Sequence, residues 1–145
     1  MLKALSRIFG TKPKEGVRQV HDPVLGTLRL AGEGWWEATV VLDGRSLGFK
    51  IGDNNGPDPA LMDHARDLLR GFPEFNKMIG EFLVNEAKRM PAAAEEIRQL
   101  EVEDVMLFWP KRPHDGMIYF RRPHKYRVWR CDYVDRKPQG LGFDD

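Results

Sequence analysis

The sequence contains very little cysteine, which excludes two common ways of stabilising a small protein. Cys131 is the only cysteine among the 145 residues, so neither an intramolecular disulfide nor a cysteine-based zinc site can form. Chains without disulfides are typical of reducing compartments. We therefore expect a cytoplasmic protein, bacterial in style, that holds no metal and no cofactor.

Long apolar runs and catalytic motifs are also missing. No stretch approaches the roughly 18 apolar residues of a membrane span, and the opening MLKALSRIFG makes a poor signal peptide because its apolar stretch is short. The sequence shows no serine elbow, P-loop, GxGxxG or HExxH motif. We expect no integral membrane association and favour a protein without catalytic activity. An enzyme of unknown class stays an alternative, because 22 acidic residues offer many general bases.

The residues that are present are typical of one soluble domain. Hydrophobic residues make up 41% of the chain and charged residues 31%, a balance found in globular proteins. We predict an N-terminal amphipathic arm over residues 1–20 and a single α+β domain over residues 21–145. Leu2, Leu5 and Ile8 share one helical face of the arm. Residues 1–14 either pack on a protein surface or make weak contact with an anionic membrane.

Alternation of apolar residues with a period of two predicts strands on both sides of a central region. The Asp43-Gly44 pair is a signal for a two-residue hairpin turn. The predicted strands are 24–30, 35–42, 45–51, 102–109, 117–121 and 127–135.

Three helices are predicted between the two groups of strands. Asp58 is placed to cap the first, with Pro59 in its first turn, and its apolar stripe continues to Phe72. A second stripe runs from residue 75 to 90, and residues 92–100 add a short third helix. Strands that surround a run of helices indicate an α+β fold. We expect βββ–ααα–βββ order, with an antiparallel sheet of about six strands and the helices packed on one face.

Charge is unevenly distributed along the chain. Residues 111–138 carry nine basic and three acidic side chains, whereas residues 74–110 carry four basic and eight acidic ones. Such asymmetry can mark a surface that binds a polyanion. The alternative is that acidic helices lie beside the basic strands and neutralise them.

The basic segment alternates with aromatic residues, a pattern that suits single-stranded nucleic acid through phosphate neutralisation and base stacking. The chain has no RNP-like motif, however, and its net charge is only +1. The candidate binding residues in this segment are Arg121, Arg122, Lys125, Tyr126, Arg127, Trp129 and Arg130.

Two neighbouring tryptophans add a further candidate. Adjacent residues of a strand point to opposite faces, so Trp35 lies on the outer face if Trp36 is in the core. Tryptophan is enriched at binding hot spots. Trp35 is therefore a candidate interface anchor, unless a loop or the arm covers it.

The sequence Arg-Pro-His occurs twice, at residues 112–114 and 122–124. Each proline interrupts a strand, so the two copies flank the predicted strand 117–121. An extended strand rises about 3.3 Å per residue, which places His114 and His124 on the order of 20 Å apart. That distance excludes a shared metal, and we interpret the two copies as turns.

Two other reactive side chains have structural interpretations. His64 lies beside Asp63 and Asp67, and we expect it on the polar flank of a helix. Cys131 alternates with two aromatic residues, so we expect a buried thiol rather than a nucleophile.

The segment HDPVLGTLRLAGEGWWEATVVLDGRSLGFKI resembles the opening of small bacterial domains of unknown function. The residues that match are Asp22, Pro23, Gly26, Trp36 and Gly44. The resemblance implies an α+β domain and supplies no catalytic residue, and some domains of that type act as immunity or partner-binding proteins. We expect a non-enzymatic protein–protein interaction module, immunity-like or regulatory, with a protein partner or a second copy as its ligand. Single-stranded nucleic-acid binding through residues 117–134 is the alternative.

Overall fold

A computed structural model describes residues 18–32, 34–53, 55–121 and 127–144. Most of the predicted arm, over residues 1–17, lies outside this part of the chain. The strands are β1 (Gln19–Asp22), β2 (Gly26–Leu30), β3 (Trp35–Leu42), β4 (Arg45–Gly52), β5 (Glu101–Leu107), β6 (Gly116–Arg121), β7 (Val128–Val134) and β8 (Lys137–Asp144). The helices are α2 (Pro59–Arg70), α3 (Phe72–Arg89), the 3-10 turn η1 (Pro91–Ala93) and α4 (Ala94–Arg98).

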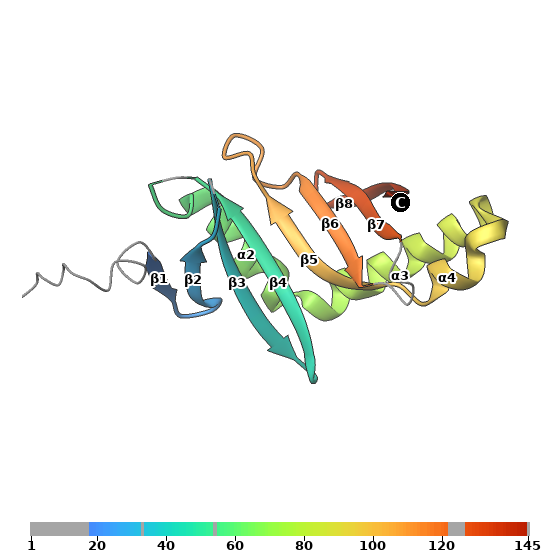
Figure 1. Ribbon diagram of the computed structural model, residues 1–145, viewed down its shortest axis with the longest axis horizontal. Helices are drawn as coiled ribbons and strands as arrows, with labels where there is room; N and C mark the ends of the chain where they lie inside the picture. Colours follow the sequence, from blue (N-terminus) through green and yellow to red (C-terminus); the bar gives the residue numbers. More distant parts are fainter. Residues whose placement is uncertain (1–17, 33, 54, 122–126, 145) are drawn as a thin grey trace, which may run out of the picture.

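The fold is α+β, as predicted, with the helices on one face of the sheet (Figure 1). The expected strand number and order were wrong, because the described residues form eight strands in ββββ–ααα–ββββ order. The prediction missed β1, whose Gln19 and Val20 were assigned to the arm, since four residues are too few to show a clear alternation. It missed β8 because Pro138 and two glycines interrupt the alternation of apolar and polar residues in that strand.

The sheet is mixed rather than antiparallel. Its spatial order follows the sequence from β1 to β8, and six of the neighbouring pairs are antiparallel. Strands β4 and β5 are parallel, because α2, α3 and α4 carry the chain back along the sheet before β5 begins (Figure 1). Their pairing covers only Gly48–Ile51 with Asp104–Leu107.

Local sequence signals explain the first helix. The Asp58 carboxylate accepts hydrogen bonds from the backbone N–H groups of Ala60 and Leu61, at 3.0 and 3.1 Å, and Pro59 occupies the first turn. An aspartate cap satisfies donors that have no partner within the helix. The predicted cap and proline are therefore confirmed.

The core lies between the helices and the inner face of the sheet. Its largest fully buried side chains include Trp36, Phe49, Phe120, Trp129 and Tyr133. They come from four different strands and occupy alternate positions in each, so the alternation that predicted the strands also selects the residues that pack under the helices.

A buried ion pair joins the β1–β2 turn to α2. Asp22 is buried, and its carboxylate accepts from the N–H groups of Val24 and Leu25, both at 2.9 Å, and from two nitrogens of Arg66 at 2.6 and 3.0 Å. The hydrogen bond from Arg66 is the main reason why the pKa of Asp22 falls from 3.8 to about 2. Removing one partner of such a pair leaves a buried charge without compensation, so the contact is costly to break. It therefore holds the β1–β2 hairpin against α2.

Candidate functional site

Three aromatic rings and one arginine form a continuous cluster at the end of the sheet where β3 begins and β5 ends. The ring centroids of Trp35 and Phe108 are 5.5 Å apart, and those of Phe108 and Trp109 are 5.8 Å apart and nearly perpendicular. The guanidinium carbon of Arg112 lies 4.8 Å from the centre of the Trp109 ring. We call these four residues the aromatic platform. Trp109 is 39% exposed, and Trp35 and Phe108 are half-buried.

A glycine brings the first two rings together. Gly52 pairs with Trp35 across β3 and β4, and the parallel register continues from Ile51–Leu107 to place Gly52 beside Phe108. A Cβ atom at Gly52 would lie 3.1 Å from the carbonyl oxygen of Phe108. Since β4 presents no side chain at this point, the rings from the two flanking strands meet above it.

The loop that carries Trp109 and Arg112 is held from two sides. Within the loop, the N–H of Arg112 donates to the carbonyl of Trp109 at 2.8 Å, and the N–H of Asp115 donates to the carbonyl of Arg112 at 3.0 Å. The β7–β8 turn donates to the same loop, from Asp135 N–H to the Asp115 carboxylate and from Arg136 N–H to the His114 carbonyl. These bonds give the platform a fixed geometry before any ligand binds, which lowers the entropy lost on binding.

That β7–β8 turn has an unusual backbone. Asp135 and Arg136 have φ angles of 50° and 68°, the left-handed region that a two-residue hairpin turn requires and that Asn-Gly or Asp-Gly normally supplies. A long side chain such as arginine is uncommon there. The Arg136 side chain donates to His114 Nε2 at 2.7 Å, so the unfavourable backbone position places a guanidinium against the platform loop.

The first histidine of the repeated Arg-Pro-His motif belongs to a buried polar cluster. His64, on α2, is only 2% exposed, so the expected polar helix flank was wrong. Its Nε2 lies 3.2 Å from the Tyr133 hydroxyl, and its ring meets the His114 ring edge-on at 4.7 Å. His64 Nδ1 has no hydrogen-bond partner within the described part of the chain. The cluster is buried because the 109–115 loop covers a helix face that the sequence left polar.

Burial lowers the pKa of His64 to about 4, and the electrostatic interactions of its ring with His114 and Arg136 act in the same direction. The ring is therefore neutral near neutral pH. Among the described residues, no group of three or more histidine, cysteine, aspartate or glutamate side chains is arranged to hold a metal ion. The second histidine of the repeat, His124, lies outside the described residues.

The candidate binding residues that the structure describes in the basic segment are either buried or paired with carboxylates. Trp129 is fully buried, and its indole N–H donates to Glu96 on α4 at 2.7 Å. Arg127 lies 2.9 Å from the same glutamate, and Arg130 lies 3.1 Å from Asp144 on β8. Arg122, Lys125 and Tyr126 are outside the described residues. Trp129 therefore presents no ring to solvent, and the two arginines are engaged by carboxylates.

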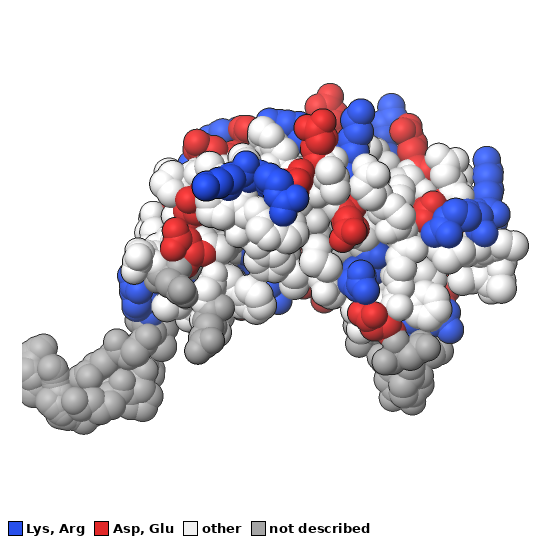
Figure 2. Space-filling model, turned by 90° about the horizontal axis from the view of Figure 1, so that it is seen from above, with Lys and Arg blue, Asp and Glu red and all other residues white. Residues whose placement is uncertain are grey.

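The surface charges are interspersed. Blue and red side chains alternate over the face shown in Figure 2, which carries no continuous basic patch. Neutralisation comes partly from a helix, at Glu96, and partly from neighbouring strands, at Asp144 and Glu101. The sequence-based alternative of acidic helices beside basic strands thus describes part of the pairing.

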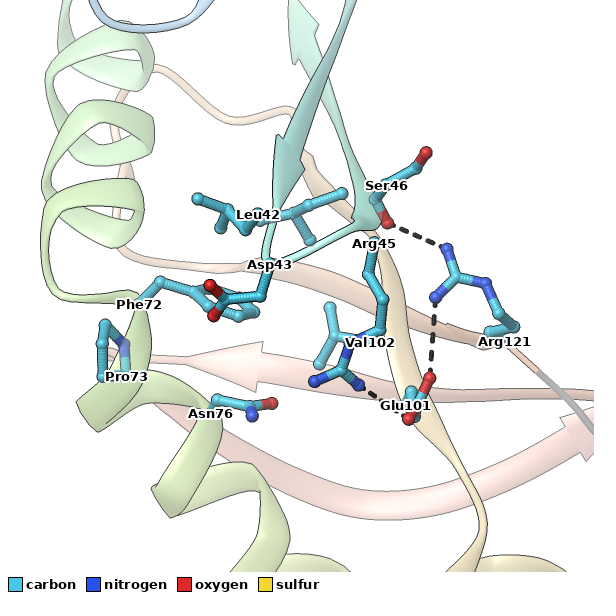
Figure 3. A pocket seen from close by; sticks show the side chains of 11 residues that line it. Leu42, Asp43, Arg45, Ser46, Phe72, Pro73, Asn76, Glu101, Val102 and Arg121 are labelled. Carbon is cyan, nitrogen blue, oxygen red and sulfur yellow. Dashed lines mark hydrogen bonds and ion pairs between the residues drawn. The ribbon is translucent and has the colours of Figure 1, made fainter.

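A pocket of about 290 Å³ lies at the opposite end of the sheet from the platform. We call it the hairpin pocket, because the tip of the β3–β4 hairpin forms one wall (Figure 3). Among the predicted binding residues that the structure describes, only Arg121 lines it. Arg121 donates to the carbonyl of Ser46 at 2.8 Å and lies 3.8 Å from Glu101. The lining residues are Leu42, Asp43, Arg45, Ser46, Leu47, Phe72, Pro73, Asn76, Glu101, Val102 and Arg121.

Cys131 is buried, as expected, and burial raises its pKa to about 12. A thiol that stays protonated at neutral pH is a poor nucleophile. Cys131 therefore contributes to packing and not to a reactive site.

Of the four platform residues, the sequence analysis named only Trp35 as a candidate. The predicted strand 102–109 included Trp109, whereas β5 ends at Leu107 and Trp109 lies exposed in the loop that follows. Pro110 was the available signal, because a proline has no N–H to donate to a strand ladder and so interrupts pairing.

No described helix has both the length and the apolar character that crossing a membrane requires. Comparison of the chain with family models, curated proteins and solved structures finds no match. The resemblance to small bacterial domains therefore stays a prediction.

Proposed function

We propose that the protein is a non-enzymatic interaction module that binds a protein partner on the aromatic platform. The observation that supports this most directly is the contact between Trp35, Phe108 and Trp109, which brings distant parts of the sequence into one partly exposed apolar surface. Tryptophan and arginine are the residue types that most often dominate binding energy at protein interfaces.

The platform also indicates the chemistry of its partner. Lys111 and Arg112 are exposed beside Trp109, and Arg112 keeps donors free because its contact with Asp115 is long, at 3.7 Å. An apolar side chain followed by a carboxylate would match the rings and this basic rim. The partner is therefore a protein segment that presents an apolar anchor next to an acidic residue.

Single-stranded nucleic acid remains the alternative ligand. Stacking on the platform suits it, but phosphate binding requires available cations. Arg121, Arg127 and Arg130 all contact carboxylates in the described structure. We therefore place protein binding first.

Site-specific photocrosslinking tests the proposal. A benzophenone side chain at position 109 is expected to trap one discrete protein, or a second copy of the chain, in lysate of the producing cells. The same group at Val84, which is 52% exposed on α3, is the control and is expected to trap none.

Affinity measurements with the trapped partner complete the test. Trp109→Ala is expected to weaken binding by roughly 30-fold, since loss of a hot-spot tryptophan costs about 2 kcal/mol or more, whereas Val84→Ala leaves it unchanged. Equal crosslinking from both positions, or equal affinity of both variants, would contradict protein binding at the platform.

A further inference from the structure

We propose that the hairpin pocket binds a free α-amino acid with an apolar side chain. The pocket is at the far end of the sheet from the aromatic platform, so this activity is separate from partner binding. The inference rests on how the pocket forms, on its apolar floor and on the opposite charges of its two walls.

The pocket exists because two parallel strands separate. Strand β4 begins at Arg45 and β5 at Glu101, but their pairing starts only at Gly48 and Asp104. The first three residues of each strand therefore lie apart. Arg121 spans this gap, since it contacts Ser46 on one strand and Glu101 on the other.

The floor of the pocket is apolar and rigid. Leu47 and Val102 belong to the buried core, while Leu42 and Phe72 pack against that core and remain partly exposed. These side chains come from three strands and a helix, and they form a surface on which an aliphatic or aromatic side chain loses contact with water.

One wall is acidic and has unused hydrogen-bonding capacity. The Asp43 carboxylate and the Asn76 amide lie on the α3 side of the pocket (Figure 3). Neither side chain forms a hydrogen bond or an ion pair with any residue of the described chain. An ammonium group would find an anion and a carbonyl acceptor there.

The other wall is basic. Arg45 donates to Glu101 at 2.6 Å through one nitrogen and is about half exposed, so its other donors face solvent. Glu101 already lies between Arg45 and Arg121, which shows that this wall stabilises a carboxylate. A ligand carboxylate can take the remaining donors of Arg45, because a guanidinium carries five N–H groups.

Charge and size together select the ligand. An α-amino acid carries an ammonium group for Asp43, a carboxylate for Arg45 and an apolar side chain for the floor in one small molecule. The volume of about 290 Å³ lies at the lower limit of small-molecule pockets, which run from roughly 300 to 1,000 Å³. It therefore fits a single amino acid better than a nucleotide.

NMR titration of the purified chain with L-leucine and L-phenylalanine tests the inference. Saturable shifts are expected for amides of the hairpin tip, residues 42–47, and of the first turn of α3. Isopentylamine and 4-methylpentanoate, which lack the carboxylate and the ammonium group of leucine, are expected to bind at least tenfold more weakly. No saturable shift up to 50 mM, or equal binding of either analogue, overturns the proposal.

Asp43→Asn provides a sharper test, with Asp135→Asn as its matched control. Both aspartates occupy hairpin turns with φ near 50°, where asparagine is well tolerated. Asp43→Asn is expected to weaken leucine binding by about tenfold or more, and Asp135→Asn to leave it unchanged. Equal affinities overturn the proposal. The test needs no protein partner, so its result is independent of the platform.

Discussion

At the scale of single residues, His64 shows what a local pattern can and cannot predict. Its neighbours Asp63 and Asp67 are exposed, so the sequence around it is that of a polar helix flank. What buries the ring is Tyr133 and His114, which are distant in sequence. Asp58 is the opposite case, because a helix cap depends only on residues a few positions away.

The buried histidine predicts acid sensitivity. Its pKa is near 6.5 in the unfolded chain and about 4 in the folded one, so only the unfolded state takes up its proton between these values. The free energy of unfolding is therefore fully retained above pH 6.5 and falls as the pH drops toward 4, by on the order of 2–3 kcal/mol. Urea denaturation over this pH range measures the slope.

Two variants isolate this contribution. His64→Phe removes the titrating group and is expected to flatten the curve between pH 6.5 and 4, even if it lowers stability at neutral pH by leaving the Tyr133 hydroxyl without its partner. His21→Gln, at an exposed position of β1, is expected to keep the slope of the parent chain. A curve for His64→Phe as steep as that of His21→Gln would refute the assignment.

At the scale of elements, β8 is an edge strand that a helix protects. The Leu141 N–H donates to the Glu86 carboxylate at 2.9 Å, and Arg89 donates to the Leu141 carbonyl at 3.2 Å. An ion pair on α3 thus occupies both backbone groups of an edge residue, which would otherwise be free to pair with another chain. The period-two pattern of apolar residues did not reveal this strand, because Pro138, Gly140 and Gly142 interrupt the pattern.

Breaking this contact is expected to open the edge. Glu86→Ala should speed hydrogen exchange at the Leu141 amide by about tenfold or more, since the amide loses its acceptor, and should increase self-association at high concentration. Glu81→Ala, an exposed position on the same helix, makes the same change in helix propensity and is expected to alter neither. Amide exchange measured by NMR and light scattering compare the two variants; unchanged exchange at Leu141 in Glu86→Ala would show that the edge is protected by other contacts.

At the scale of the whole molecule, the sequence predicted the α+β class and the position of Trp35 on the face of the sheet opposite Trp36, but neither of the two proposed binding sites in full. The platform joins Trp35 to Trp109, and the hairpin pocket joins Asp43 to Asn76 and Glu101. Both depend on the single parallel pairing of β4 with β5. A one-dimensional pattern shows which residues alternate, but it does not show which strands become neighbours.

The distribution of charge over the molecule predicts weak affinity for nucleic acid. Because Arg121, Arg127 and Arg130 contact carboxylates, few counterions would be released from these three residues on binding DNA. A labelled oligo-dT is expected to show no mobility shift at 50 mM salt with micromolar protein. A shift that disappears steeply as salt rises would instead favour the nucleic-acid alternative.

The parallel pairing of β4 with β5 also sets the order in which the sheet can assemble. Most neighbouring strands in each half follow one another through short turns, so each four-stranded half closes only small loops. The β4–β5 pairing instead closes a loop from Gly52 to Glu101. Closing this longer loop costs more chain entropy than closing a hairpin turn. We therefore expect the two four-stranded halves to form early and the β4–β5 pairing to form late, so that the aromatic platform and the hairpin pocket are completed only in the last step of folding.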